Sequence, residues 1–236
     1  MGDIIIKESA PWFLHLLQIQ DSAFPTGTFA HSWGMETYIQ AEEIRDGDDL
    51  KAFCLAYLKE TLACGDGIFL KEAYLAAEHD DMDRLVYLDS LYHAFKLTNE
   101  MRSGSSMQGR QFLRSVEALM QDDFFHAWAE KVKDKSVWCH YALVYGLYAA
   151  RYGIPLQAAL EAYMYAAILN LVLNAVRAVP LGQKTGIQVM YDLLPAINLA
   201  AQESSEARLE DLNSRAIGID IASMKHEHLH TRLYIS

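Results

Sequence analysis

A helical period in the apolar side chains constrains the fold of this chain more than any other feature of its sequence. From Asp48 to Leu62, residues recur every three or four positions on one predicted helix face: Leu50, Phe53, Cys54, Tyr57, Leu58, Thr61 and Leu62. The same period continues over residues 68–79 and 82–97. No convincing alternation of apolar and polar residues, the mark of a half-buried β-strand, accompanies it. The sequence therefore predicts an all-α fold.

Helix boundaries are predicted from capping residues, glycines and prolines. Asp48 or Asp49 is expected to accept the first backbone N–H groups of its helix, and the Gly65–Gly67 stretch is expected to end that helix. Gly153 is expected to end a later helix, and Pro155 to lie in the first turn of the next one. An aromatic stripe before Gly153 is interpreted as a packed core face; it comprises Val137, Tyr141, Val144, Tyr145 and Tyr148.

The most apolar stretch of the chain runs from Ala162 to Val176. It is shorter than the roughly 17–25 residues that a membrane-spanning helix requires, and it carries Asn170 and Asn174. A helix of this composition is typical of the buried centre of a bundle. With no polar linker and no internal repeat, residues 1–236 are predicted to form a single-domain helical bundle of roughly eight to ten helices.

Composition narrows the class of protein. The net charge of −11 repels a phosphate backbone, so nucleic acid is not expected as a partner. The three cysteines lie far apart without C-x-x-C spacing, which is typical of a reducing compartment. The first residues lack the basic start and long apolar run of a secretory signal. We therefore expect a cytoplasmic protein that contacts other proteins and not a membrane.

Two segments depart from the regular helical pattern. In residues 16–36, Pro25 and Gly27 interrupt the helical pattern with a turn. In residues 173–188, the apolar helix runs into Arg177, Pro180 and Gly182, and Pro180 does not continue a helix comfortably. Arg177 is expected to find acceptors among the carbonyl groups of the last turn and so to fix the geometry of the loop.

The C-terminal tail contains the letters H-E-x-x-H, at His226, Glu227 and His230. A zinc protease needs this pattern within a stable helix, together with a third protein ligand. So close to the chain end, a docking arm with solvated histidines is the preferred interpretation. Residues 221–236 are predicted to be a C-terminal partner-docking tail. Two alternatives stay open: a helical metal-binding hydrolase that uses the tail, and a weak metal site formed by His226, His228 and His230.

Taken together, the unusual segments resemble the UreF family of urease accessory proteins. The element near the N-terminus is met by Pro25, Gly27, Phe29, Ser32, Gly34 and Glu36. The second element is met by Ala175, Val176, Arg177, Pro180, Leu181, Gly182 and Gln183. The third is met by Met224, Lys225, His226, Glu227, Leu229, Arg232, Leu233, Tyr234 and Ser236. The stretch from Met101 to Leu113 also fits the middle of the family. The chain departs from it at Lys184, Thr185, Ile187 and His230.

The resemblance implies an all-helical, dimerising protein without catalysis of its own. Such a protein binds the accessory protein UreD (also called UreH), recruits the GTPase UreG and docks on apo-urease. The assembly delivers nickel, and carbon dioxide as a lysine carbamate, into the urease active site, so nickel is handled by the complex and no cofactor is expected here. The resemblance also assigns partner binding to Pro25, Gly27, Phe29, Ser32, Gly34, Glu36, Arg177, Pro180, Gly182, Gln183, Lys225, His226, Glu227, Leu229, Arg232, Leu233 and Tyr234.

Overall fold

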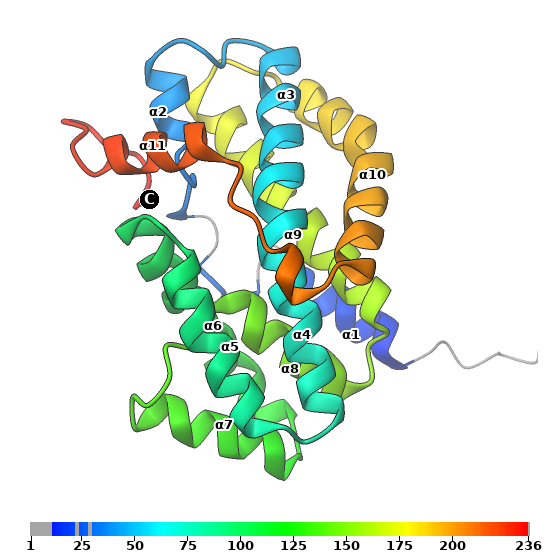
Figure 1. Cartoon of the computed structure of the whole chain (residues 1–236). Helices are drawn as coiled ribbons and strands as arrows, with labels where there is room; N and C mark the ends of the chain where they lie inside the picture. The colour runs from blue at the N-terminus through cyan, green and yellow to red at the C-terminus, as the bar shows by residue number, and fades with distance from the viewer. Residues whose placement is uncertain (1–10, 22–23, 28–29, 236) are drawn as a thin grey trace, which may run out of the picture.

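Helices joined by short connections make up the computed structural model, which describes residues 11–21, 24–27 and 30–235 (Figure 1). In chain order they are α1 (Pro11–Gln20), α2 (Met35–Gln40), α3 (Gly47–Tyr57), α4 (Gly67–Glu78), α5 (Met82–Phe95), α6 (Asn99–Val116), α7 (Asp123–Lys133), α8 (Tyr141–Tyr152), α9 (Leu156–Ala178), α10 (Gln183–Glu206) and α11 (Ile217–His226). No β-strand occurs in these residue ranges. The all-α prediction is confirmed.

The helix that begins with α3 does not end at the Gly65–Gly67 stretch, so that prediction is wrong. A π-helical segment, Leu58–Asp66, joins α3 to α4 in one continuous run (Figure 1). Gly67 serves close packing here. A Cβ atom on this residue would lie 2.3 Å from the Ser204 hydroxyl oxygen and 2.8 Å from the Met164 methyl carbon. The glycine therefore lets α9 and α10 approach the α3–α4 rod.

The predicted caps are right in kind and shifted in position. At the start of α3, the cap is Asp46: its carboxylate accepts the backbone N–H groups of Asp48 and Asp49, each at 3.0 Å. Gly153 ends α8 with a left-handed φ of 81°, as predicted. Pro155 is the residue just before α9 and not a member of its first turn.

The core is built around α8, which packs against α4 and α6. The predicted aromatic stripe forms its centre, since Tyr145 and Tyr148 are fully buried and Tyr141 nearly so. Tyr148 also meets the ring of Phe125 from α7, edge to face at 5.6 Å. This interior fixes the bundle on which the N- and C-terminal segments are placed.

Helix α9 is the one helix among the described residues that is long and apolar enough to cross a membrane by length and composition alone. It packs against α10 and also contacts α4 and α8. Only 56% of its most apolar window is buried, because Tyr165 and neighbouring side chains face outward beside α10. The prediction of a helix buried on all sides is therefore wrong in part: α9 is a core helix with one open face.

Helix α11 lies against α2 and the start of α6, far along the chain from both (Figure 1). This placement brings the C-terminal segment onto the segment that precedes α3. The segment around α2 and the C-terminal segment, which contain the first and third family-like elements, thus meet at one end of the bundle.

Candidate functional site

Glu36, in the first turn of α2, is the point at which the N- and C-terminal segments join. Its side chain is 2% exposed. One carboxylate oxygen accepts the backbone N–H of Leu233 at 2.8 Å, and the other accepts that of Tyr234 at 3.1 Å. His226 Nε2 lies 2.9 Å from the same carboxylate. A buried carboxylate needs such donors, because burial without them carries a large desolvation cost.

His226 bridges two carboxylates and is itself fully buried. Its Nδ1 lies 2.8 Å from Glu100 of α6, while its Nε2 faces Glu36. Each ring nitrogen of His226 therefore faces one carboxylate. Arg232 contributes a positive charge, with its guanidinium 3.0 Å from the second oxygen of Glu100. We call Glu36, Glu100, His226 and Arg232 the tail clasp.

Further hydrogen bonds attach the tail beyond the clasp. The Tyr234 hydroxyl donates to the carbonyl of Asn174 in α9 at 2.9 Å. The backbone N–H of Ile235 donates to the carbonyl of Ala30 at 2.7 Å. Tyr234 is buried, whereas Leu233 and Ile235 are 73% and 55% exposed. The tail is therefore anchored at alternate points and presents apolar side chains outward.

Two asparagines of α9 form hydrogen bonds to the segment that precedes α2. Both Asn170 and Asn174 donate through their side-chain amides to the carbonyl of His31, at 3.1 Å and 2.9 Å. The His31 ring stacks on Trp33 with centroids 4.9 Å apart. Burial lowers the pKa of His31 to about 4, so the ring is neutral near pH 7. These contacts fix the backbone immediately before α2.

Gly34 is required where α11 crosses this segment. Its φ is 85°, in the left-handed region that favours glycine. A Cβ atom added there would lie 3.0 Å from the Ile219 carbonyl oxygen and 3.1 Å from the Ser223 nitrogen. Ser223 also contacts the start of α6, since its hydroxyl lies 2.9 Å from that of Thr98. Gly34 thus allows the close approach of α11 on which the tail clasp depends.

The structure places the predicted site residues in two groups. Ser32, Gly34, Glu36, His226 and Tyr234 are buried in or beside the tail clasp. Those that reach solvent wholly or in part are Pro25, Gly27, Arg177, Pro180, Gly182, Gln183, Lys225, Glu227, Leu229, Arg232 and Leu233. Phe29 lies outside the described residues. The first and third signature segments therefore come together, and Asn174, which directly precedes the second, contacts both of them.

The expected role of Arg177 in fixing the loop stays a prediction. The residue is exposed at the end of α9, and its charge lowers the pKa of Tyr234, against the larger effect of burial, which raises it. Close backbone contacts shape the loop that follows: Val179 N–H donates to Ala175 at 2.8 Å and Leu181 N–H donates to Val179 at 2.6 Å.

The tail corrects the expectation of solvated histidines at a frayed chain end. α11 ends at His226, so the H-E-x-x-H letters do not lie along one helix. Both ring nitrogens of His226 already face carboxylates, while His228 and His230 are exposed. Within the described ranges, no group of three or more His, Cys, Asp or Glu residues has a geometry that could hold a metal ion. The geometry of a zinc protease is not formed here.

Sequence reasoning missed Glu100 and the supporting roles of Asn170 and Asn174. The asparagines carried a usable signal, because two amides one turn apart on an apolar helix need polar partners inside the fold. Glu100 carried none, since one acidic residue in the first turn of a helix is ordinary. Only the packing of α11 against α6 shows that its carboxylate faces His226.

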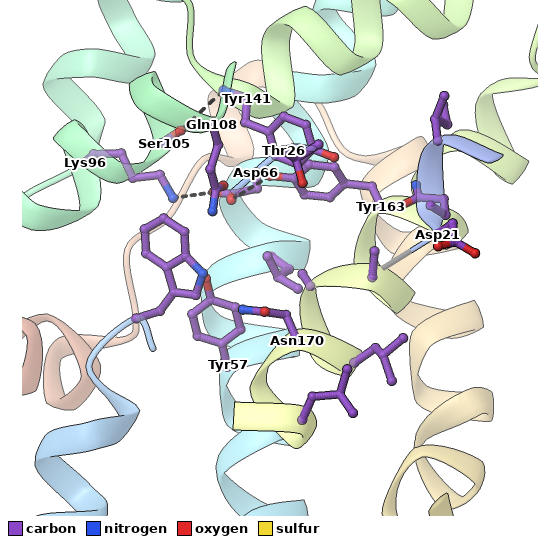
Figure 2. A pocket seen from close by; sticks show the side chains of 18 residues that line it. Asp21, Thr26, Tyr57, Asp66, Lys96, Ser105, Gln108, Tyr141, Tyr163 and Asn170 are labelled. Atoms are coloured by element: carbon purple, nitrogen blue, oxygen red, sulfur yellow. Dashed lines mark hydrogen bonds and ion pairs between the residues drawn. The ribbon is translucent and has the colours of Figure 1, made fainter. Parts of the chain in front are cut away.

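A polar cavity of about 60 Å³ adjoins the site (Figure 2). Its wall includes a buried ion pair, with Lys96 Nζ 2.7 Å from Asp66, to which the Tyr163 hydroxyl also donates at 3.2 Å. Gln108 Nε2 and Asn170 Oδ1 are buried without a protein partner on this wall. Since one water needs about 10–15 Å³, the cavity has room for a few waters and none for a nucleotide.

An apolar groove of about 620 Å³ lies between α9 and α10, on the face where α9 is open. Ile187 and Tyr191 are its most exposed members, at 72% and 70%, and Tyr165 and Leu194 continue it. Helix α1, which packs on α9, adds exposed Phe13, Leu14 and Leu17 to the apolar surface of the molecule. Contiguous exposed apolar surface of this kind is typical of a protein interface.

Fold and site define a class: an all-α bundle whose terminal segments are joined by a buried carboxylate–histidine cluster and whose outer faces suit protein contacts. The sequence profile of the UreF family matches residues 44–194. A urease accessory protein UreF of Sporosarcina pasteurii is 48% identical over 202 residues, covering 86% of this chain and all of that relative. The chain belongs to the UreF family.

Other relatives match along nearly their whole length. The urease accessory protein UreF of Bacillus sp. (strain TB-90) is 33% identical over 223 residues, which cover 94% of this chain and 98% of the relative. That of Lachnoclostridium phytofermentans is 35% identical over 225 residues, covering 95% and 99%. The similarity thus extends beyond the residues that the family profile matches.

Proposed function

We propose that this chain is a urease maturation factor that acts in the cytoplasm as an adaptor and catalyses no reaction itself. The relatives that the chain matches over nearly their whole length are named urease accessory proteins. The observation that carries the proposal is the tail clasp, because it joins two of the family's segments and holds the tail with Leu233 and Ile235 facing outward. A preordered apolar segment binds a partner at a lower entropic cost than a disordered one.

The proposed partners are UreD (UreH), the GTPase UreG and apo-urease. The tail and the surface around Pro25 and Lys225 would meet UreD, and the resulting assembly would recruit UreG and couple its GTPase cycle to the transfer of nickel. Nickel is cargo of the assembly in this proposal. The acidic surface of the chain, with its net charge of −11, fits contact with proteins better than contact with nucleic acid.

The proposal includes a homodimer formed through the α9–α10 groove. Two copies of a chain with net charge −11 repel one another at long range. A mostly apolar face without acidic residues minimises that repulsion where two copies meet, and the groove that Ile187, Tyr191 and Leu194 line is such a face. A twofold contact between identical grooves would bury the exposed rings and aliphatic side chains of both copies.

Co-expression tests the assembly directly. The full-length chain is expected to co-purify with UreD, and UreG is expected to join only when both are present. Cells that carry the urease structural proteins without this chain are expected to accumulate inactive apo-urease, and the wild-type chain is expected to restore activity. Failure of the wild-type chain to bind UreD, or to restore activity, would overturn the proposal.

The metal-dependent hydrolase alternative has its own discriminating variant. His230→Tyr destroys H-E-x-x-H and restores the aromatic residue that is common in the family. His230 is exposed. Urease activation is expected to survive this change, and the purified protein is expected to lack stoichiometric zinc. Loss of activation with an intact assembly would instead assign a metal role to the histidine.

A further inference from the structure

Helix α6 carries an unbalanced group of positive charges. Arg102, Arg110 and Arg114 follow one another along it, and none of them forms a salt bridge within the described chain. The only acidic residue of α6 is Glu100, which the tail clasp already engages. In a chain with net charge −11, three arginines on one helix that form no salt bridge within the described residues are unexpected.

Two of these arginines line a groove of about 630 Å³ beside the tail. Arg110 and Arg114 stand on one wall with Met107, whose side chain is 46% exposed. Pro25 and Ile235 form the opposite side. The groove therefore has a largely apolar lining with two guanidinium groups at α6, and its other side is formed by the segment around Pro25 together with Ile235 of the tail.

Internal contacts hold this surface in place. The Arg110 guanidinium donates to the Trp138 carbonyl at 3.1 Å, and the Trp138 ring, 49% exposed, stacks on His93 with centroids 3.8 Å apart. Arg114 has no such contact and is exposed. Ordered Arg, Trp and Met side chains on a surface are the composition of a protein interface and of its strongest contacts.

From this surface we infer that the α6 groove binds an acidic segment of a partner protein, with an apolar side chain seated against Met107 and Ile235. At least two carboxylates of the segment pair with Arg110 and Arg114, because a guanidinium forms bidentate bonds to a carboxylate. A nucleic acid is disfavoured by the charge of the whole chain. A second copy of this chain is disfavoured because the free face of α6 is basic and would meet itself.

This inference rests on the proposed function, because the tail that walls the groove is the proposed docking element for UreD. The probe is therefore purified UreD, tested against the full-length chain by interferometry at low and high salt. The central variant is the double change Arg110→Glu with Arg114→Glu. Arg114→Glu alone is a second variant that removes no internal contact. Arg215→Glu is the matched control, since Arg215 is exposed and lies in the connection before α11.

The double variant is expected to lower the affinity for UreD by about 10- to 100-fold at low salt, as expected for lost charge pairs across an interface. Arg114→Glu is expected to lower it by a smaller factor, and Arg215→Glu is expected to leave it within about twofold. The salt dependence of binding is expected to flatten in the double variant, because fewer ion pairs remain to be screened.

A photo-crosslinking residue in place of Gln111 locates the occupant. In the assembled complex, its crosslink is expected to map to a UreD segment with clustered Asp or Glu residues. Wild-type affinity of the double variant, or a crosslink to a segment without such residues or to a second copy of this chain, would overturn the inference while leaving the proposed function intact. Absence of binding by the wild-type chain would overturn the proposed function and this inference with it.

Discussion

At the scale of single residues, the buried pair of Glu36 and His226 determines where the tail lies. Glu36 receives two backbone N–H groups of the tail and one ring nitrogen of His226. The motif letters predicted that these residues matter, but not that they face one another. Residues 190 positions apart in sequence meet only through the packing of α11 on α2, and no local pattern in the sequence encodes that packing.

Glu36→Gln tests this cluster without changing its size. The amide would place an N–H₂ group against donors that now meet a carboxylate, and it would leave the His226 ring with one negatively charged partner in place of two. We expect a loss of about 1–3 kcal/mol in the free energy of unfolding, measured by urea denaturation. Glu210→Gln, at an exposed position, is the control and is expected to change the free energy of unfolding by less than about 0.5 kcal/mol. Equal stability of wild type and Glu36→Gln would show that the buried contacts do not hold the tail.

At the scale of elements, the sequence predicted helices well and their ends less well. The 3.6-residue period of Leu50, Phe53 and Tyr57 survives in the structure because their burial coincides with local propensity. The Gly65–Gly67 stretch misled the boundary prediction because Gly67 does not end the helix. A glycine is needed there since Met164 and Ser204 of other helices pack against its Cα. The open face of α9 was hidden for a related reason: apolar side chains on an exposed face and in a core look the same in a sequence.

Tyr191→Glu tests the proposed dimer face on α10. Tyr191 is 70% exposed in the α9–α10 groove, so a charge there is expected to leave the helical fold intact and to disfavour burial against a second copy. Light scattering is expected to give a dimer for wild type and the 26.7 kDa monomer for the variant. Tyr87→Glu, at a 52% exposed tyrosine of α5, is the control and is expected to remain dimeric. A dimeric Tyr191→Glu protein would place the interface elsewhere.

At the scale of the whole molecule, the stability of the bundle is expected to fall on acidification. Burial lowers the pKa of His31 to about 4 and that of His140 to about 3, against about 6.5 in the unfolded chain. Between pH 6.5 and 4 the unfolded state therefore binds more protons, and stability falls as the pH falls. Burial raises the pKa of Asp89 to about 6, which acts in the opposite sense through a smaller shift.

Urea denaturation from pH 7 to pH 4.5 checks this expectation. The free energy of unfolding is expected to decrease steadily over that range, and His31→Leu is expected to make the decrease shallower because one titrating group is removed. A free energy of unfolding that is constant or that increases toward pH 4.5 would contradict the neutral, buried state of these rings.

In the function proposed above, the tail that Glu36 holds against the bundle is the docking element of a urease maturation factor. Deletion of residues 227–236 keeps α11 and His226 and removes Arg232, Leu233 and Tyr234. The most direct measurement is co-purification of this truncated chain with UreD and UreG, together with the urease activity it restores. The predicted result is a helical protein, shown by circular dichroism, that neither assembles with UreD nor activates urease. A truncated chain that assembles and activates as well as the full-length chain would contradict the claim.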